Sequence, residues 1–184
     1  MSRLTDIARG TEASALVEFA ITVPLLVVFI VGIYDFSAAY NQEQKLEHAA
    51  QTGAVIAAAQ PRTDIYNGNA SPDSLKPVVE VVFNSLATNN VLPLANQSPC
   101  AAASSSVTPT GLVWTYQISG CPDQLTIVIN SAAVQAGPPA TVGTSVTVTY
   151  PYRWRFNSAI QLLFPANYSA ITDLTETATV HNQL

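Results

Sequence analysis

Residues 19–34 read FAITVPLLVVFIVGIY, a run without a charged side chain. Counted back to Ala13, the apolar segment is about 22 residues long, and Glu18 is the one charged residue in it. As a helix it would extend ~33 Å, which matches the ~30 Å hydrocarbon core of a bilayer. We therefore expect a membrane span at about residues 15–34.

The basic residues around this segment indicate its orientation. Arg3 and Arg9 precede it, whereas Lys45 is the first basic residue after it. Cytoplasmic flanks of membrane spans are enriched in Lys and Arg, so we expect a single-pass protein with a cytoplasmic amino terminus and an exported remainder. Asp35, just past the span, is expected to be an interfacial charge, with a contact between subunits as the alternative.

The composition is typical of a membrane protein or of a subunit of an assembly, and it excludes other functional classes of protein. Charged residues make up 10% of the 184 residues, against roughly 25% in typical soluble domains, while hydrophobic residues reach 48%. A fully soluble cytoplasmic protein is disfavoured. The net charge of -5, with seven scattered Lys and Arg residues, excludes a nucleic-acid partner.

The helical pattern continues beyond the span. Apolar and small residues recur at steps of three and four as far as Gln60, and Pro61 ends the pattern. We expect one long helix over residues 14–60. Its outer half is rich in Ala and Gly, which permits close packing either on the protein's own sheet, the favoured arrangement, or on neighbouring subunits.

The composition of the chain changes at residue 61, and we expect an exported head over residues 61–184. Residues 61–72 resemble a loop, and Ser71-Pro72 favours the start of a helix through Leu86, with a strand as the competing prediction. Alternating apolar residues predict three strands, at 113–118, 125–129 and 146–150, and a weaker fourth at 175–181. A short amphipathic helix is expected at 157–164.

The two cysteines of the chain are Cys100 and Cys121, and both fall on the exported side. They flank the Ser-rich loop 101–109, so we expect a disulfide in an oxidising compartment. Two buried thiols and a catalytic thiol are the alternatives. Neither these cysteines nor His48 and His181 have the spacing of metal ligands, so we expect no metal and no cofactor.

Sequence motifs for catalysis are missing from the chain, so we expect no enzyme. The one concentrated basic and aromatic element is Arg153-Trp154-Arg155. It is expected to be an outward strand end, and contacts with a sugar, lipid headgroups or another subunit stay open.

A family resemblance rests on ASALVEFAITVPLL at residues 13–26, followed by GIYDF at residues 32–36 and AAY at residues 38–40. These residues resemble the amino terminus of the TadE-like family, the minor pseudopilins of the Tad (Flp) pilus. The resemblance implies an α+β pilin-like fold, in which a long helix packs on a small antiparallel sheet of three or four strands. It also implies a non-enzymatic component of a type IV-like pilus in the bacterial inner membrane. The head would be periplasmic, or extracellular in the filament, and the partners would be other pilins and inner-membrane assembly proteins.

Processing is a further implication of the resemblance. In related prepilins a membrane peptidase cuts before the fourth residue preceding the Glu, which here is the bond between Ala13 and Ser14. Residues 1–13 would then be a cytoplasmic leader, and Glu18 would be the assembly carboxylate that meets the new amine of a neighbouring subunit. Gly usually precedes the cut and Ala13 stands here, so processed and unprocessed forms both stay open.

A different function class also fits the sequence. The segment Ser37-Ala38-Ala39 could be the cleavage site of an ordinary signal peptide. The mature protein would then be a secreted binding domain that begins near Tyr40. An enzyme of unrecognised type is the third alternative.

Overall fold

A computed structural model describes residues 2–65, 69–135, 140–155 and 171–182, with side chains from Ser14 onward. The chain divides into two compact units. Met1–Ala39 and Trp154–Ala170 form the first, and Tyr40–Arg153 and Ile171–Leu184 form the second, which we call the head unit. The predicted helix 157–164 lies outside the described residues.

The amino-terminal helix α1 spans Ser2–Ala59. Its end falls just before Pro61, which lacks a backbone donor and cannot continue a helix. From Tyr40 onward, one face of α1 is buried in the core of the head unit, through Leu46, Ala49, Ala50, Ala54 and Ala57. The small residues of this part therefore pack on the protein's own core, as the sequence predicts.

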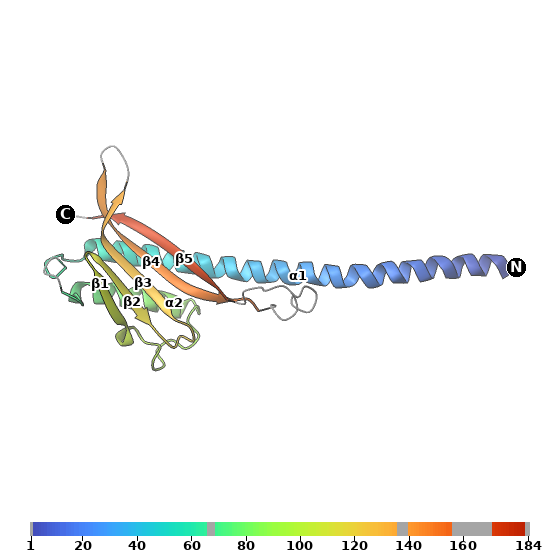
Figure 1. The fold of residues 1–184 in the computed structure, drawn as a ribbon, viewed down its shortest axis with the longest axis horizontal. Coiled ribbons are helices and arrows are strands. Elements are labelled where there is room, and N and C mark those ends of the chain that lie inside the picture. Colours follow the sequence, from blue (N-terminus) through green and yellow to red (C-terminus); the bar gives the residue numbers. More distant parts are fainter. Residues whose placement is uncertain (1, 66–68, 136–139, 156–170, 183–184) are drawn as a thin grey trace. The chain divides into compact units, whose positions relative to one another are not determined.

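The sheet of the head unit has five antiparallel strands in sequential order (Figure 1). Its strands are β1 Ser106–Thr110, β2 Val113–Ile118, β3 Leu125–Gln135, β4 Thr141–Arg153 and β5 Ile171–His181. The predicted α+β fold, a long apolar helix packed on a small antiparallel sheet, is confirmed. The predicted count of three or four strands is wrong, because β1 forms where we expected only a Ser-rich loop.

Alternation decides which face of the sheet is buried. Trp114, Tyr116 and Ile118 of β2 are at most 1% exposed. The residues between them turn outward. The outward face carries many hydroxyl side chains, and two cross-strand pairs bond directly: Thr147 with Thr177 at 2.8 Å and Thr149 with Thr175 at 3.0 Å. Such pairs stabilise a solvent-facing sheet.

The second helix begins after a short 3-10 turn. The turn is η1, Asp73–Leu75, and the helix is α2, Lys76–Thr88, with Pro77 in its first turn where no backbone donor is needed. Its inward face is fully buried, through Val78, Val79, Val82, Phe83 and Leu86. The predicted helix is confirmed and the competing strand is wrong, because helical spacing buries all five apolar residues on one side.

At Gly53, α1 lies close to both α2 and the sheet. A Cβ at this position would lie 2.5 Å from Cγ2 of Val82 in α2 and 3.3 Å from Cγ1 of Val146 in β4. A larger residue must therefore displace the facing side chains. The absence of a side chain lets the helix sit close to both layers.

We predict that Gly53→Val lowers the free energy of unfolding of the head unit by about 1–3 kcal/mol, because overpacking strains a filled core. Gly32→Val is the matched control, since nothing lies within 4 Å of a Cβ at Gly32. Thermal unfolding of the full chain in detergent, followed by near-UV circular dichroism, measures the difference. Equal stability of the two variants would contradict the packing at Gly53.

Candidate membrane-anchoring and assembly site

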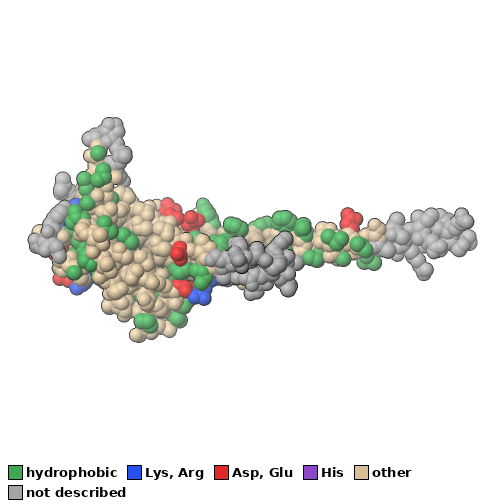
Figure 2. All heavy atoms as spheres, in the orientation of Figure 1, with side chains coloured by type: hydrophobic (Ala, Val, Ile, Leu, Met, Phe, Trp, Pro, Cys, Tyr) green, Lys and Arg blue, Asp and Glu red, His purple; other side chains and the backbone are tan. Residues whose placement is uncertain are grey.

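The first unit presents an apolar helix surface that the described residues do not cover. Between residues 16 and 33 most large apolar side chains of α1 are more than half exposed, including Leu16, Phe19, Ile21, Leu25, Phe29 and Ile33. Figure 2 shows hydrophobic side chains along this part of the helix. By length and composition the segment is a candidate membrane span. A bilayer would bury apolar surface worth about 25 cal/mol per Å².

Glu18 lies on this exposed helix. Its own backbone carbonyl accepts a hydrogen bond from Oγ1 of Thr22 at 2.8 Å. Among the described side chains, which begin at Ser14, no Lys or Arg pairs with the Glu18 carboxylate. A carboxylate at the centre of a span costs about 2.5–3.5 kcal/mol on insertion scales, and less near the interface. Glu18 can therefore gain from a cation supplied by another molecule.

The predicted processing position lies within the helix. Ala13 and Ser14 are both in the helical backbone of α1, and the Ser14 side chain is exposed. The side chain of Ala13 lies outside the described residues. These residues stay candidates for processing.

Just beyond the candidate span, α1 contacts Trp154 and Arg155, which follow β4 in the sequence. The carboxylate of Asp35 accepts a hydrogen bond from the backbone N–H of Arg155 at 3.4 Å. The rings of Phe36 and Trp154 meet edge to face, with centroids 5.4 Å apart. Asp35 is only 3% exposed, so its carboxylate is covered within the protein, and its expected place at the membrane interface stays a prediction. The sequence separation of 120 between Asp35 and Arg155 hid this contact from sequence analysis.

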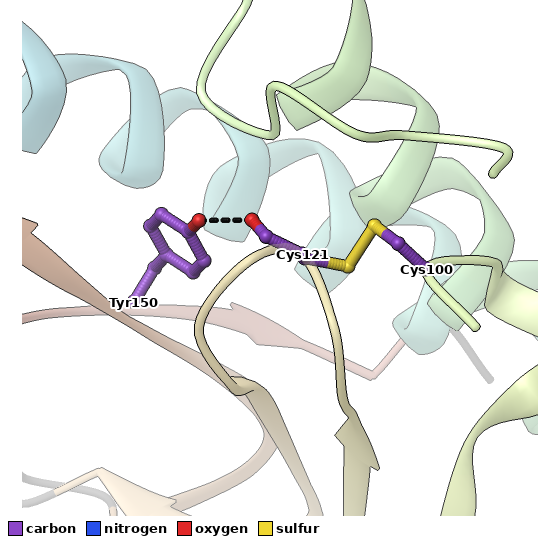
Figure 3. The surroundings of a disulfide bond; sticks show 3 residues. All are labelled: Cys100, Cys121 and Tyr150. Carbon is purple, nitrogen blue, oxygen red and sulfur yellow. Dashed lines mark hydrogen bonds between the residues drawn. A yellow bond between two sulfur atoms is a disulfide. The ribbon is translucent and has the colours of Figure 1, made fainter. Parts of the chain in front are cut away.

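The head unit contains a disulfide between Cys100 and Cys121, whose Cα atoms are 4.9 Å apart (Figure 3). Both cysteines are fully buried. The Tyr150 hydroxyl points toward the loop and donates to the Cys121 carbonyl. Burial raises the pKa of Tyr150 to about 12, so the hydroxyl keeps its proton and stays a donor near neutral pH. The disulfide and this hydrogen bond join residue 100, the turn at residue 121 and β4.

A charged pair joins the same turn to the end of β4. The Arg153 guanidinium donates to both oxygens of Asp123, at 2.7 and 2.5 Å. The hydrogen bond from Arg153 lowers the pKa of Asp123, so this carboxylate stays ionised near neutral pH. Arg153 is thereby engaged within the head unit.

The carboxylate of Glu176 in β5 interacts with carboxylates of α1. Burial raises the pKa of Glu176, and a hydrogen bond with Glu43 and the charges of Glu43 and Glu47 raise it further. Glu43 and Glu176 are only partly buried and Glu47 is exposed, so water screens this repulsion. The sequence spacing of Glu43 and Glu176 gives no signal of it.

Beyond these contacts, the described part of the chain offers few candidates for a catalytic or binding site. Within it, no three His, Cys, Asp or Glu residues gather as a metal site would need. A cavity of about 550 Å³ lies against α2, with Lys76, Glu80, Asn84, Asn96 and Tyr116 among its lining residues. The buried Tyr116 hydroxyl has no hydrogen-bond partner in the described structure. Burial raises its pKa to about 12, so it keeps its proton.

Residues 13–55 match the family model of TadE-like proteins. The resemblance predicted from the sequence is confirmed over this segment. It contains the exposed apolar run and Glu18, and it ends inside α1, so α2 and the sheet lie beyond the TadE-like match. Neither a curated protein nor a solved structure matches the chain.

We predict that Glu176→Gln raises the melting temperature at pH 7. A carboxyl whose folded pKa lies above its ordinary value of 4.5 contributes stability below that value and loses it as the pH rises through the folded pKa. The gain should therefore shrink as the pH approaches about 4. The matched control is Glu80→Gln, a change at an exposed position of α2. Thermal melts at both pH values measure the effect, and a gain of equal size at pH 4 would contradict this explanation.

Proposed function

We propose that this chain is a minor pseudopilin of a Tad (Flp) pilus, a non-enzymatic structural component of a type IV-like assembly. The observation that carries the proposal is the TadE-like match over residues 13–55, on a helix whose apolar side chains are exposed. Residues 15–34 would anchor the protein in the bacterial inner membrane with its amino terminus in the cytoplasm. Other pilins and inner-membrane assembly proteins would be its partners.

The proposed mechanism of assembly centres on Glu18. A prepilin peptidase would cut between Ala13 and Ser14, remove the leader 1–13 and create a charged amine at Ser14. That amine would pair with Glu18 of a neighbouring subunit. Pairing of the two opposite charges in a low-dielectric environment removes the cost of leaving either one unpaired. The position of this pair would set the register between subunits.

The disulfide supports an exported head over residues 61–184. Disulfides persist in oxidising compartments such as the bacterial periplasm and are rare in the cytosol. The Cys100–Cys121 bond is buried in the head unit. A formed disulfide fits a head outside the cytoplasm.

The alternative of a secreted domain places a signal-peptide cut at residues 37–39. Helix α1 runs without a break through these residues. Ala39 is 8% exposed and belongs to the buried residues of the chain. A cut there would sever a continuous helix, so the structure favours a pseudopilin over a secreted domain.

The start of the mature chain tests the processing step. We predict that protein recovered from the membranes of its own host begins at Ser14, and that Ala13→Leu abolishes this start because a larger residue would not fit a pocket shaped for Gly. Intact-mass measurement and amino-terminal sequencing give the answer. A start near Tyr40 would contradict the pseudopilin. A start at Met1 or Ser2 would contradict processing and leave a permanently anchored assembly protein.

Assembly tests the role of Glu18. In a host that lacks the endogenous copy, we predict that Glu18→Ala reduces filaments by at least about tenfold, because loss of one partner of a buried ion pair costs about 3–5 kcal/mol. Glu80→Ala is the matched control, since it removes an exposed carboxylate of α2. Electron microscopy counts filaments per cell, and immunoblots of the membrane fraction verify equal amounts of protein. Wild-type filament numbers with Glu18→Ala would refute this role.

A further inference from the structure

The contact of α1 with Trp154 and Arg155 falls at a defined depth if the span is placed in a bilayer. Phe36 follows Tyr34, the last residue of the apolar run, by two residues, or ~3 Å along the helix axis. The headgroup layer extends roughly 5–7 Å beyond the hydrocarbon core on each side. When residues 15–34 fill the core, Phe36 therefore lies within the headgroup layer.

Two contacts hold Trp154 and Arg155 at that depth. The Asp35 carboxylate accepts the Arg155 backbone N–H, and the Phe36 ring meets the Trp154 ring edge to face. All four residues belong to the first compact unit. Two consecutive residues of α1 thus contact two consecutive residues, Trp154 and Arg155. These contacts fix the position of the Trp154 indole along the axis of α1.

The side chains at this depth have the chemistry of a membrane interface. Tyr34 is 57% exposed and Phe36 is 67% exposed, and Trp154 is half-buried. Trp and Tyr are enriched at the boundary between lipid and water, because their rings are apolar and their tips can hydrogen-bond.

Arg155, which follows Trp154 in the sequence, supplies a cation at this depth. Its side chain is exposed, and among the described residues no carboxylate pairs with its guanidinium. Arg153 differs, since Asp123 holds its guanidinium at 2.5 Å. A guanidinium matches the geometry of a phosphate, to which it donates two parallel hydrogen bonds.

We propose that Tyr34, Phe36, Trp154 and Arg155 form a second membrane contact, in which the rings enter the headgroup layer of the outer leaflet and Arg155 binds a phospholipid phosphate. This inference rests on the proposed function, since it requires α1 to span the bilayer. The contact adds polar and aromatic anchoring to the span, and so fixes how deep α1 sits.

Depth-dependent fluorescence quenching tests the proposal, because the chain has two Trp residues. The full chain is reconstituted into vesicles of phosphatidylcholine and phosphatidylglycerol that carry bromine at a shallow or a deep acyl position. Trp114→Phe leaves Trp154 as the reporter. Trp154→Phe leaves Trp114, which is 1% exposed in the core of the head unit, as the matched control. We expect shallow bromine to quench Trp154 at least twofold more than deep bromine, and Trp114 to be unaffected.

A third variant separates this inference from the anchor itself. Leu25→Trp, in a background with Trp114→Phe and Trp154→Phe, reports on the middle of the span and should be quenched most by deep bromine. If it is quenched while Trp154 is not, the headgroup contact is refuted and the span stands, so another subunit or a sugar would occupy this surface. If Leu25→Trp is not quenched, the anchor and the contact are both refuted.

The role of Arg155 is tested in the Trp114→Phe background. We expect Arg155→Gln to reduce the shallow quenching of Trp154 about twofold when phosphatidylglycerol is present. Lys76→Gln, which removes an exposed cation of α2, should leave it unchanged. Equal quenching with and without the Arg155 change would refute the phosphate contact.

Discussion

The apolar side chains of α1 between residues 16 and 33 need an environment other than water, and the described part of the chain does not cover them. The helix is the right element for this need, because it satisfies its own backbone hydrogen bonds in hydrocarbon. From Tyr40 onward one face of the same helix packs in the core of the head unit, and its residues become small. Gly53 permits a close approach to α2 and the sheet. One helix therefore has an exposed apolar part and a part that packs on protein, and its change of composition marks the border.

The few charges of the chain follow from this arrangement. Glu18 is the one charged residue of the apolar segment, and no described Lys or Arg pairs with it, which fits the proposed partner in a neighbouring subunit. Asp35 is covered where the helix leaves the proposed span, by contact with the segment after β4. Asp123 and Arg153 pair within the head unit. Beside them, the disulfide joins residue 100 to the turn at residue 121, and the Tyr150 hydroxyl joins this turn to β4.

Sequence reasoning succeeded where the signal was local. The helix end at Pro61, strand β2 at residues 113–118 and the disulfide follow from breakers, alternation and the count of cysteines. β1 was missed because Ser106–Thr110 is short, contains Pro109 and has little apolar character; its pairing with β2 makes it a strand. β3 and β4 are likewise longer than the predicted strands 125–129 and 146–150, because their additional residues pair with each other. The contacts of Asp35 with Arg155 and of Glu176 with Glu43 join distant residues, and no spacing rule predicts them. The proposed partner of Glu18 lies in another subunit, so only the family resemblance pointed to it.

The central claim is that residues 15–34 cross a bilayer and leave the head on its outer side. Alkaline carbonate extraction of host membranes, combined with protease added to intact spheroplasts, tests both halves of this claim. The account predicts that the protein stays in the carbonate-washed membranes and that external protease digests its head, with a lysed sample as the reference. Release of the protein by carbonate, or a head protected until the spheroplasts are lysed, would contradict it.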